Sequence, residues 1–81
     1  MKVKILTFAS IKDICGFDER DIDIPKEIVL SELMNKLSKE FPDLNNMTGS
    51  MLFAKNEEYC TLETILKDGD TLAIFPPVSG G

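Results

Sequence analysis

The sequence predicts an α+β fold in which a mixed β-sheet wraps around one main helix, with short helices beside it. Only residues 30–41 carry apolar side chains at full helical spacing, whereas several short runs alternate in the manner of strands. The chain has 81 residues, enough for one small core. Because one amphipathic helix covers only one face of a sheet, we expect a two-layer domain over residues 1–75 and an extended tail over residues 76–81.

Two strands are expected in the first third of the chain. Residues 2–8 alternate so that one set faces the core, namely Val3, Ile5 and Thr7. The other set contains a lysine, which places Leu6 and Phe8 on an outer face. Residues 18–24 predict a second strand, which Pro25 closes and which should pair antiparallel with the first. Its inward side should carry Ile22 and Ile24, with Arg20 on the same parity.

Two helices are expected around these strands. A short helix should begin with Ser10 as its cap, with Asp13 completing a shortened capping box, and Gly16 should end it. The long helix over residues 30–41 has one apolar stripe, formed by Leu30, Leu33, Met34, Leu37 and Phe41. Pro42 terminates it, because the residue before a proline is disfavoured in helical conformation. This stripe is expected to face the core.

The second half of the chain predicts a polar loop over residues 43–50 and then three strands. These strands should cover residues 51–55, 58–61 and 71–75. Asn56 and Glu57 are expected at the turn between the first two, and the Lys-Asp-Gly-Asp run at 67–70 is a strong turn signal. A single helical turn is expected over Leu62, Ile65 and Leu66. The last strand should direct Leu72 and Ile74 toward the helix, and Ala73 and Phe75 away from it.

Composition narrows the class of function. The net charge is −5, and the nine Lys and Arg residues form no basic stripe, so nucleic acid is not an expected partner. An acidic surface suits a basic cleft on a protein partner, although solubility alone explains it equally well. No membrane span or signal peptide is found, so we expect no membrane partner and a cytoplasmic location. Cys15 and Cys60, with no His, predict buried small side chains rather than a metal site or a disulfide.

The last six residues, 76–81, form a tail with an unusual pattern. Pro76 and Pro77 lack N–H groups and fix φ, so they end the sheet ladder and project a stiff arm, which reaches roughly 20 Å. The arm continues through Val78, Ser79, Gly80 and Gly81, and it tapers to bare backbone. A disordered end or a cloning scar is the plain alternative. The Pro-Pro stop in front of Gly-Gly favours delivery of the Gly81 carboxylate into a narrow pocket on another protein.

The expected chemistry is that of a passive chain end. An α-carboxyl has a pKa of about 3.5, so it is an anion and a poor electrophile at neutral pH. The sequence has no Gly-rich phosphate loop, no His and no internal pair of nucleophile and base. Activation should therefore come from partner proteins, and Gly81 should be the site at which they act.

Together these features resemble a known family. The resemblance rests on residues 8–16, 54–56, 66–70 and 75–81, and the last of these (Phe-Pro-Pro-Val-Ser-Gly-Gly) is the most specific. The sequence resembles, essentially end to end, the small sulfur-carrier subunits of molybdopterin synthase, which are ubiquitin-like β-grasp proteins. The resemblance implies that an adenylating enzyme uses ATP in trans, that a sulfur donor protein converts the Gly81 carboxylate into a thiocarboxylate, and that this chain binds no cofactor.

The resemblance also implies the later steps. The tail, residues 76–80, should insert into the large catalytic subunit, where sulfur passes to a pyranopterin phosphate, and two carriers should sit on a dimeric large subunit to make a heterotetramer. The outer sheet face, with Phe8, Tyr59 and Phe75, should bind these partners, unless the aromatic residues fill a minor core. Three alternatives remain open: a carrier for thiamine or tRNA thiolation, a ubiquitin-like modifier conjugated through Gly81, or a plain binding module.

Overall fold

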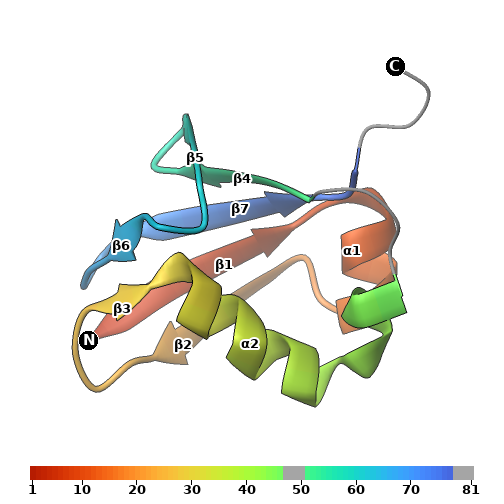
Figure 1. The fold of residues 1–81 in the computed structure, drawn as a ribbon, viewed down its shortest axis with the longest axis horizontal. Coiled ribbons are helices and arrows are strands. Elements are labelled where there is room, and N and C mark those ends of the chain that lie inside the picture. The colour runs from red at the N-terminus through yellow and green to blue at the C-terminus, as the bar shows by residue number, and fades with distance from the viewer. Residues whose placement is uncertain (47–50, 78–81) are drawn as a thin grey trace.

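Short strands alternate with two α-helices in the computed structural model, which describes residues 1–46 and 51–77 (Figure 1). The elements in chain order are β1 (Lys2–Thr7), α1 (Ala9–Cys15), β2 (Glu19–Asp23), β3 (Ile28–Val29), α2 (Leu30–Glu40), the 3₁₀ turn η1 (Pro42–Asn46), β4 (Leu52–Lys55), β5 (Glu58–Cys60), β6 (Ile65–Leu66) and β7 (Thr71–Phe75).

The main sheet has five strands in the order β2-β1-β7-β4-β5, and β3 pairs with β6 in a separate two-stranded sheet. β1 and β7 are parallel neighbours at the centre, whereas β2, β4 and β5 pair antiparallel with their neighbours. The mixed sheet and the single long helix confirm the predicted α+β class. The predicted antiparallel pairing of the first two strands is also confirmed.

One face of the sheet is buried against α2, which runs across it in Figure 1. The helix buries the first four residues of its predicted stripe, while Phe41 is partly buried at its C-terminal end. The inward sets of the central strands are buried as predicted, namely Val3, Ile5, Thr7, Leu72 and Ile74. Each fully buried aliphatic side chain contributes about 1.5–3 kcal/mol, so this layer holds the domain together.

The start of α1 differs from the sequence prediction. Phe8 is the N-cap and makes no side-chain cap, so Ser10 lies inside the first turn and does not cap the helix. Asp13 therefore sits too far along to complete a capping box. The reason is that Ala9 takes a left-handed backbone, with φ of 50°, and turns the chain so that the N-cap falls two residues earlier than predicted. The predicted end is confirmed, because Gly16 is the C-cap with φ of 77°.

The predicted helical turn over Leu62, Ile65 and Leu66 is wrong. Ile65 and Leu66 form β6, which pairs with β3, a strand that the sequence analysis did not predict. Only Leu66 of the three is buried. Residues 62–63 form a turn, in which the Thr64 N–H donates to Thr61 O at 3.0 Å, and no helix follows it. The carbonyl groups of this segment accept the first N–H groups of α2: Ser31 donates to Leu62 O at 3.0 Å, and Leu30 donates to Thr64 O at 2.8 Å. A distant loop thus replaces a side-chain cap for α2.

The remaining differences are small. The loop expected from residue 43 begins as η1, which buries Leu44, and residues 47–50 lie outside the described part of the chain.

Cys15 is buried and Cys60 is half-buried, and both thiols are free. Burial raises the pKa of the Cys15 thiol, because the charged thiolate is less well solvated there.

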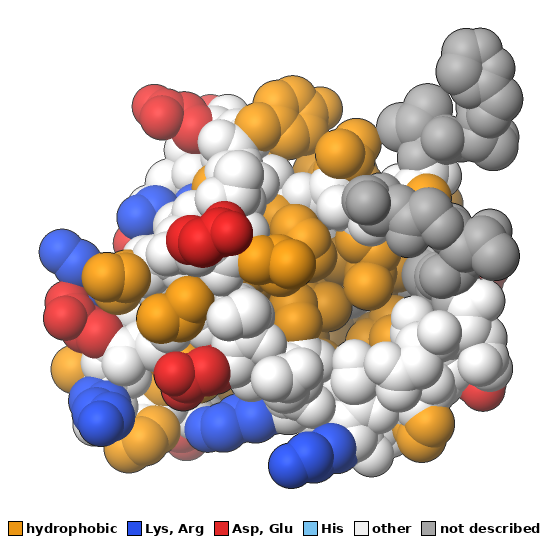
Figure 2. All heavy atoms as spheres, viewed as in Figure 1, with side chains coloured by type: hydrophobic (Ala, Val, Ile, Leu, Met, Phe, Trp, Pro, Cys, Tyr) orange, Lys and Arg blue, Asp and Glu red, His pale blue; other side chains and the backbone are white. Residues whose placement is uncertain are grey.

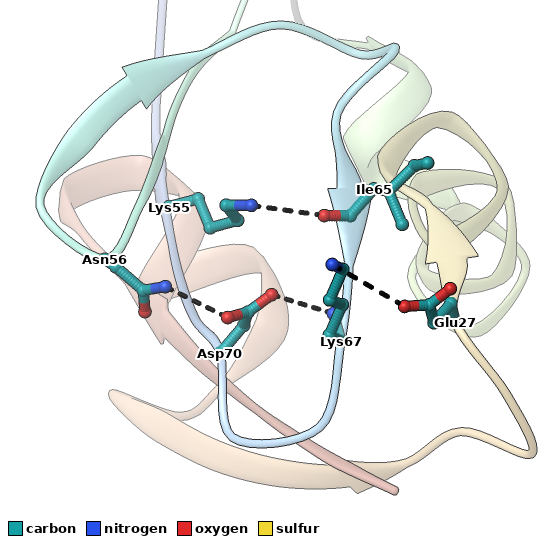
Figure 3. Close-up of polar contacts among 6 residues, drawn as sticks. All are labelled: Glu27, Lys55, Asn56, Ile65, Lys67 and Asp70. Carbon is teal, nitrogen blue, oxygen red and sulfur yellow. Dashed lines mark hydrogen bonds and ion pairs between the residues drawn. The ribbon is translucent and has the colours of Figure 1, made fainter.

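The Lys-Asp-Gly-Asp turn is tied to the β4–β5 turn by polar contacts (Figure 3). The Asp70 carboxylate accepts hydrogen bonds from Asn56 Nδ2 at 3.0 Å and from the Lys67 N–H at 2.7 Å. Asn56 Oδ1 in turn accepts the Thr71 N–H at 2.9 Å. Lys55 donates to the Ile65 carbonyl at 3.3 Å. These contacts fix the end of the sheet where the chain enters β7.

Asp70 should make stability depend on pH. Partial burial alone raises the pKa of its carboxyl, but the hydrogen bonds from Asn56 and Lys67, with the nearby charges of Lys55 and Lys67, outweigh burial and lower it. A lowered folded pKa means that the stabilisation is present above the unfolded value of about 3.9 and is lost as the pH falls through the folded value.

Asp70→Asn should therefore lower the free energy of unfolding by about 1–3 kcal/mol at neutral pH, because it removes a charge-assisted acceptor. The difference from the wild type should shrink in acid, below about pH 4. Urea unfolding followed by circular dichroism at both pH values measures this. Asp13→Asn, at an exposed position of α1, is the matched control. An equal loss in both variants would contradict the role of the contacts at Asp70.

Candidate functional site

The face of the sheet opposite α2 carries an open apolar hollow of about 530 Å³. Its floor follows from strand register, because Leu6, Ala73, Ala54 and Tyr59 lie side by side across β1, β7, β4 and β5. The two alanines are small, so the larger side chains around them stand above the floor and make the hollow. Exposed apolar surface of this kind is typical of protein interaction sites.

Two phenylalanines stand at one end of the hollow. The rings of Phe8 and Phe75 stack with centroids 4.7 Å apart and an angle of 10° between planes. The parallel register explains this, because Leu6 pairs with Ala73 and the next outward residues on the two strands are Phe8 and Phe75. Such a pair contributes about 0.5–1.5 kcal/mol beyond its buried area.

Tyr59 lines the same hollow from β5 and is 77% exposed. The structure thus brings together all three aromatic residues that the sequence analysis placed on this face. Phe8 is 41% exposed, so the stack leaves much of its ring open to a partner. The alternative, in which these residues fill a minor core, does not fit exposed fractions of this size.

The sequence analysis did not select several residues of this site. Leu52 pairs with Phe75 and is 37% exposed, and Ala54 pairs with Ala73 on the floor. Glu57 lines the hollow from the β4–β5 turn. Alternation within the predicted strand over residues 51–55 could have placed Leu52 and Ala54 on the outward face, since both have the same parity. It could not have predicted the residues with which they pair on the neighbouring strand.

The tail begins at this site. Pro76 and Pro77 follow β7 directly and are half-buried, so the root of the tail lies next to the stacked rings. The other four tail residues lie outside the described residues, and these are Val78, Ser79, Gly80 and Gly81. Their predicted roles in insertion and sulfur transfer stay predictions.

A second apolar surface lies on the helix side of the sheet. Figure 2 shows hydrophobic side chains gathered at the centre of the face seen in Figure 1. A second hollow on this side is smaller, about 220 Å³, and its apolar lining comes from Met34, Leu44, Met51, Phe53 and Leu62.

Within residues 1–46 and 51–77, no cluster of three or more His, Cys, Asp or Glu is arranged to hold a metal ion. No helix in those ranges has the length and apolar character needed to cross a membrane.

Charged groups border the first hollow. Lys4 pairs with Glu19 at 3.7 Å across β1 and β2, and Lys12 of α1 pairs with Asp18 at 2.6 Å. The hydrogen bond and charge of Asp18 raise the pKa of the Lys12 ammonium. These two pairs offset four of the charges on the β2 side, whereas Glu57 places a carboxylate on the opposite side.

Sequence comparison matches the chain with one family. The sequence model of the ThiS family matches residues 5–81. The molybdopterin synthase sulfur carrier subunit of Arabidopsis thaliana is 32% identical over 81 residues, which cover 100% of this chain and 84% of that protein. The protein of the same name from Dictyostelium discoideum is 38% identical over 81 residues, which cover 96% of this chain and 94% of that protein.

Solved structures agree with the sequence comparison. A putative molybdopterin converting factor subunit 1 from Pyrococcus furiosus superposes with a TM-score of 0.85 at 28% identity, covering 96% of this chain and 99% of that chain. Small archaeal modifier protein 1 from Methanosarcina acetivorans gives 0.78 at 28% identity, with coverage of 99% and 96%. A chain in the complex of subunits 1 and 2 of molybdopterin-converting factor from Helicobacter pylori gives 0.65 at 29% identity, with coverage of 100% of both.

The exposed position of Tyr59 can be tested by stability. Tyr59→Ala should change the free energy of unfolding by less than about 0.5 kcal/mol, because the side chain is mostly in water. Phe53→Ala is the matched control on the adjacent strand, since Phe53 is 7% exposed on the core face. It should cost about 3–5 kcal/mol. Urea unfolding of both variants measures this, and comparable losses would place Tyr59 in a core.

Proposed function

This chain belongs to the ThiS family and is a relative of the molybdopterin synthase sulfur carrier subunits, and from that premise we propose that it carries sulfur on Gly81 to a molybdopterin synthase. Its fold is the ubiquitin-like β-grasp. One observation carries the proposal. The central strand β7 ends beside the exposed aromatic residues Phe8, Tyr59 and Phe75, which we call the aromatic site, and the chain continues through two prolines to a Gly-Gly that the family match includes.

The proposed chemistry has two stages, and the first loads the carrier. The Gly81 carboxylate attacks ATP on an adenylating enzyme, pyrophosphate leaves, and an acyl-adenylate forms. Sulfide-level sulfur, released by a donor protein as hydrosulfide, then attacks the acyl carbon and displaces AMP, which leaves a thiocarboxylate and a proton. Bare glycine suits both displacements, since no side chain obstructs the approach to the carbonyl carbon. The catalytic groups and the ATP site belong to the enzyme that loads the carrier.

The second stage unloads it. Residues 76–80 insert into the large synthase subunit, and the thiocarboxylate gives its sulfur to a pyranopterin phosphate. Two such cycles make the dithiolene of molybdopterin. The Helicobacter pylori relative is in a complex with subunit 2, which supports a large-subunit partner for this chain. We propose two carriers on a dimeric large subunit, in the cytoplasm.

The aromatic site is the proposed docking surface for these partners. Phe8, Tyr59 and Phe75 give a partner apolar area that is already solvent-exposed and next to the tail. A partner that docks on this surface would therefore have the start of the tail close to its own binding pocket. The net charge of −5 favours encounter with a basic cleft.

A second candidate function is conjugation to proteins. The match with small archaeal modifier protein 1 at 28% identity favours it, because a modifier uses the same activated Gly81 acyl group. Attack by a target lysine amine would displace AMP and leave an amide. Adducts of higher mass that survive denaturation and reductant would support this function, whereas thiocarboxylate alone supports the carrier. Identification of the proteins that co-purify separates a molybdopterin synthase from thiamine or tRNA thiolation.

Deletion of Gly81 should abolish sulfur loading and leave folding unchanged. With the adenylating enzyme, ATP and a sulfur donor, the wild-type mass should rise by the exchange of one oxygen for one sulfur. Ser79→Ala, which keeps the length and the carboxylate, is the control. Intact mass spectrometry measures both, and it also checks that Gly81 carries the terminal carboxyl. If the truncated protein still supports molybdopterin formation, the Gly81 carboxylate is not the site.

Phe75→Asp should weaken binding to the large subunit by about 2 kcal/mol or more, because it places a charge in a desolvated contact. The loss of stability should be limited to about 0.5–1.5 kcal/mol from the ring stack, since Phe75 is only half-buried on the outer face. Asn35→Asp adds the same charge on an exposed position of α2 and is the control. Isothermal titration calorimetry measures binding. A large loss of stability with unchanged binding would place Phe75 in the core.

A further inference from the structure

One backbone strain in this fold lies beside the tail. Among the described residues, Ala9, Asn56 and Glu57 are the non-glycine residues with positive φ. Asn56 and Glu57 form the tight turn of the β4–β5 hairpin, which requires that conformation. Ala9 lies in no hairpin, and a left-handed alanine costs about 1–2 kcal/mol. Strain of this kind persists only where the surrounding structure holds it.

The strain at Ala9 keeps Phe8 in an extended conformation. Phe8 has φ of −133° and ψ of 149°, so it continues the outward alternation of β1 although α1 begins at the next residue. An earlier, gradual turn into the helix would take the Phe8 ring off the sheet face. The sharp turn at Ala9 therefore holds the ring in register with β7, where it stacks on Phe75.

Phe75 is thus held from both sides. Phe8 stacks on it from the β1 side, and Leu52 pairs with it from β4. Phe75 is also the last residue of β7, and Pro76 and Pro77 follow it. Because the prolines fix φ at two positions, few free backbone torsions separate Phe75 from the direction in which the chain leaves the sheet.

We infer that Phe8 is a positioning residue, whose ring fixes Phe75 and so sets the direction in which the tail is presented to the adenylating enzyme. This inference rests on the proposed function. It differs from a docking role: a docking residue stabilises the bound complex, whereas a positioning residue also governs the reaction within that complex. Tyr59 provides the contrast, since it lies in the same hollow but on β5, away from the end of β7.

The test compares variants in adenylation kinetics with the adenylating enzyme from the same host. Phe8→Ala and Phe8→Leu should both lower kcat by about tenfold or more, because misplacement by about 1 Å costs up to about a hundredfold. Phe8→Tyr keeps a stacking ring and should retain kcat. Tyr59→Ala should raise KM and leave kcat unchanged, as expected for loss of uniform binding.

A second readout needs no partner. The Phe8 ring current should displace the NMR signals of the Phe75 ring protons, and this displacement should persist in Phe8→Tyr and vanish in Phe8→Leu. Thermal unfolding serves as the folding control: Phe8→Ala and Phe8→Leu should lose the contribution of the stacked rings and still unfold cooperatively. If Phe8→Ala does not fold, Phe8→Leu and Phe8→Tyr still provide the comparison.

The results separate this inference from its premise. Loss of kcat in Phe8→Leu with retention in Phe8→Tyr supports positioning by the stacked ring. A rise in KM alone at Phe8, as at Tyr59, would overturn the inference and leave the carrier function standing. Absence of adenylation of the wild-type chain would overturn both.

Discussion

Parallel pairing of the first and last strands at the centre of the sheet is the constraint on which the rest of this structure depends. β1 and β7 pair through Leu6 and Ala73, and their inward residues form the middle of the core against α2. Parallel neighbours require a long crossover, and here nearly the whole chain, including α2, is that crossover. The chain end therefore leaves the sheet from its centre, beside the start of α1.

The same pairing gives the sheet two faces with different kinds of side chain. The inward face takes large aliphatic side chains and supplies stability. The outward face combines small residues on the floor, Ala54 and Ala73, with aromatic residues around it. One helix suffices to bury the inward face of a domain of this size, so the outward face is available for recognition. Its most exposed member, Tyr59, is expected to tolerate substitution with little effect on folding.

Local patterns predicted most of this fold because they have short periods. Alternation assigned the faces of β1 and β7, and the helical stripe identified α2, so the sequence alone placed Phe8 and Phe75 on the same face, where their rings stack. Predictions failed where distant contacts decide. The Ser10 cap was wrong because the turn at Ala9 makes Phe8, two residues earlier, the N-cap. The helical turn near Leu62 was wrong because its carbonyl is needed by the N-terminus of α2. Neither contact leaves a local signal.

The proposed chemistry could be inferred from the sequence for a different reason. A reactive chain end has no pocket of its own, so its signature is composition at consecutive positions, and no folding is needed to assemble it. The surface that presents it is another matter, because it depends on register across β1, β7, β4 and β5. In the proposed carrier, recognition and delivery would share one strand: the outward residues of β7 line the apolar hollow, and the tail begins directly after the last residue of that strand. Any change that shifts β7 in register would therefore disturb docking and delivery together, whereas changes confined to β5 would disturb docking alone.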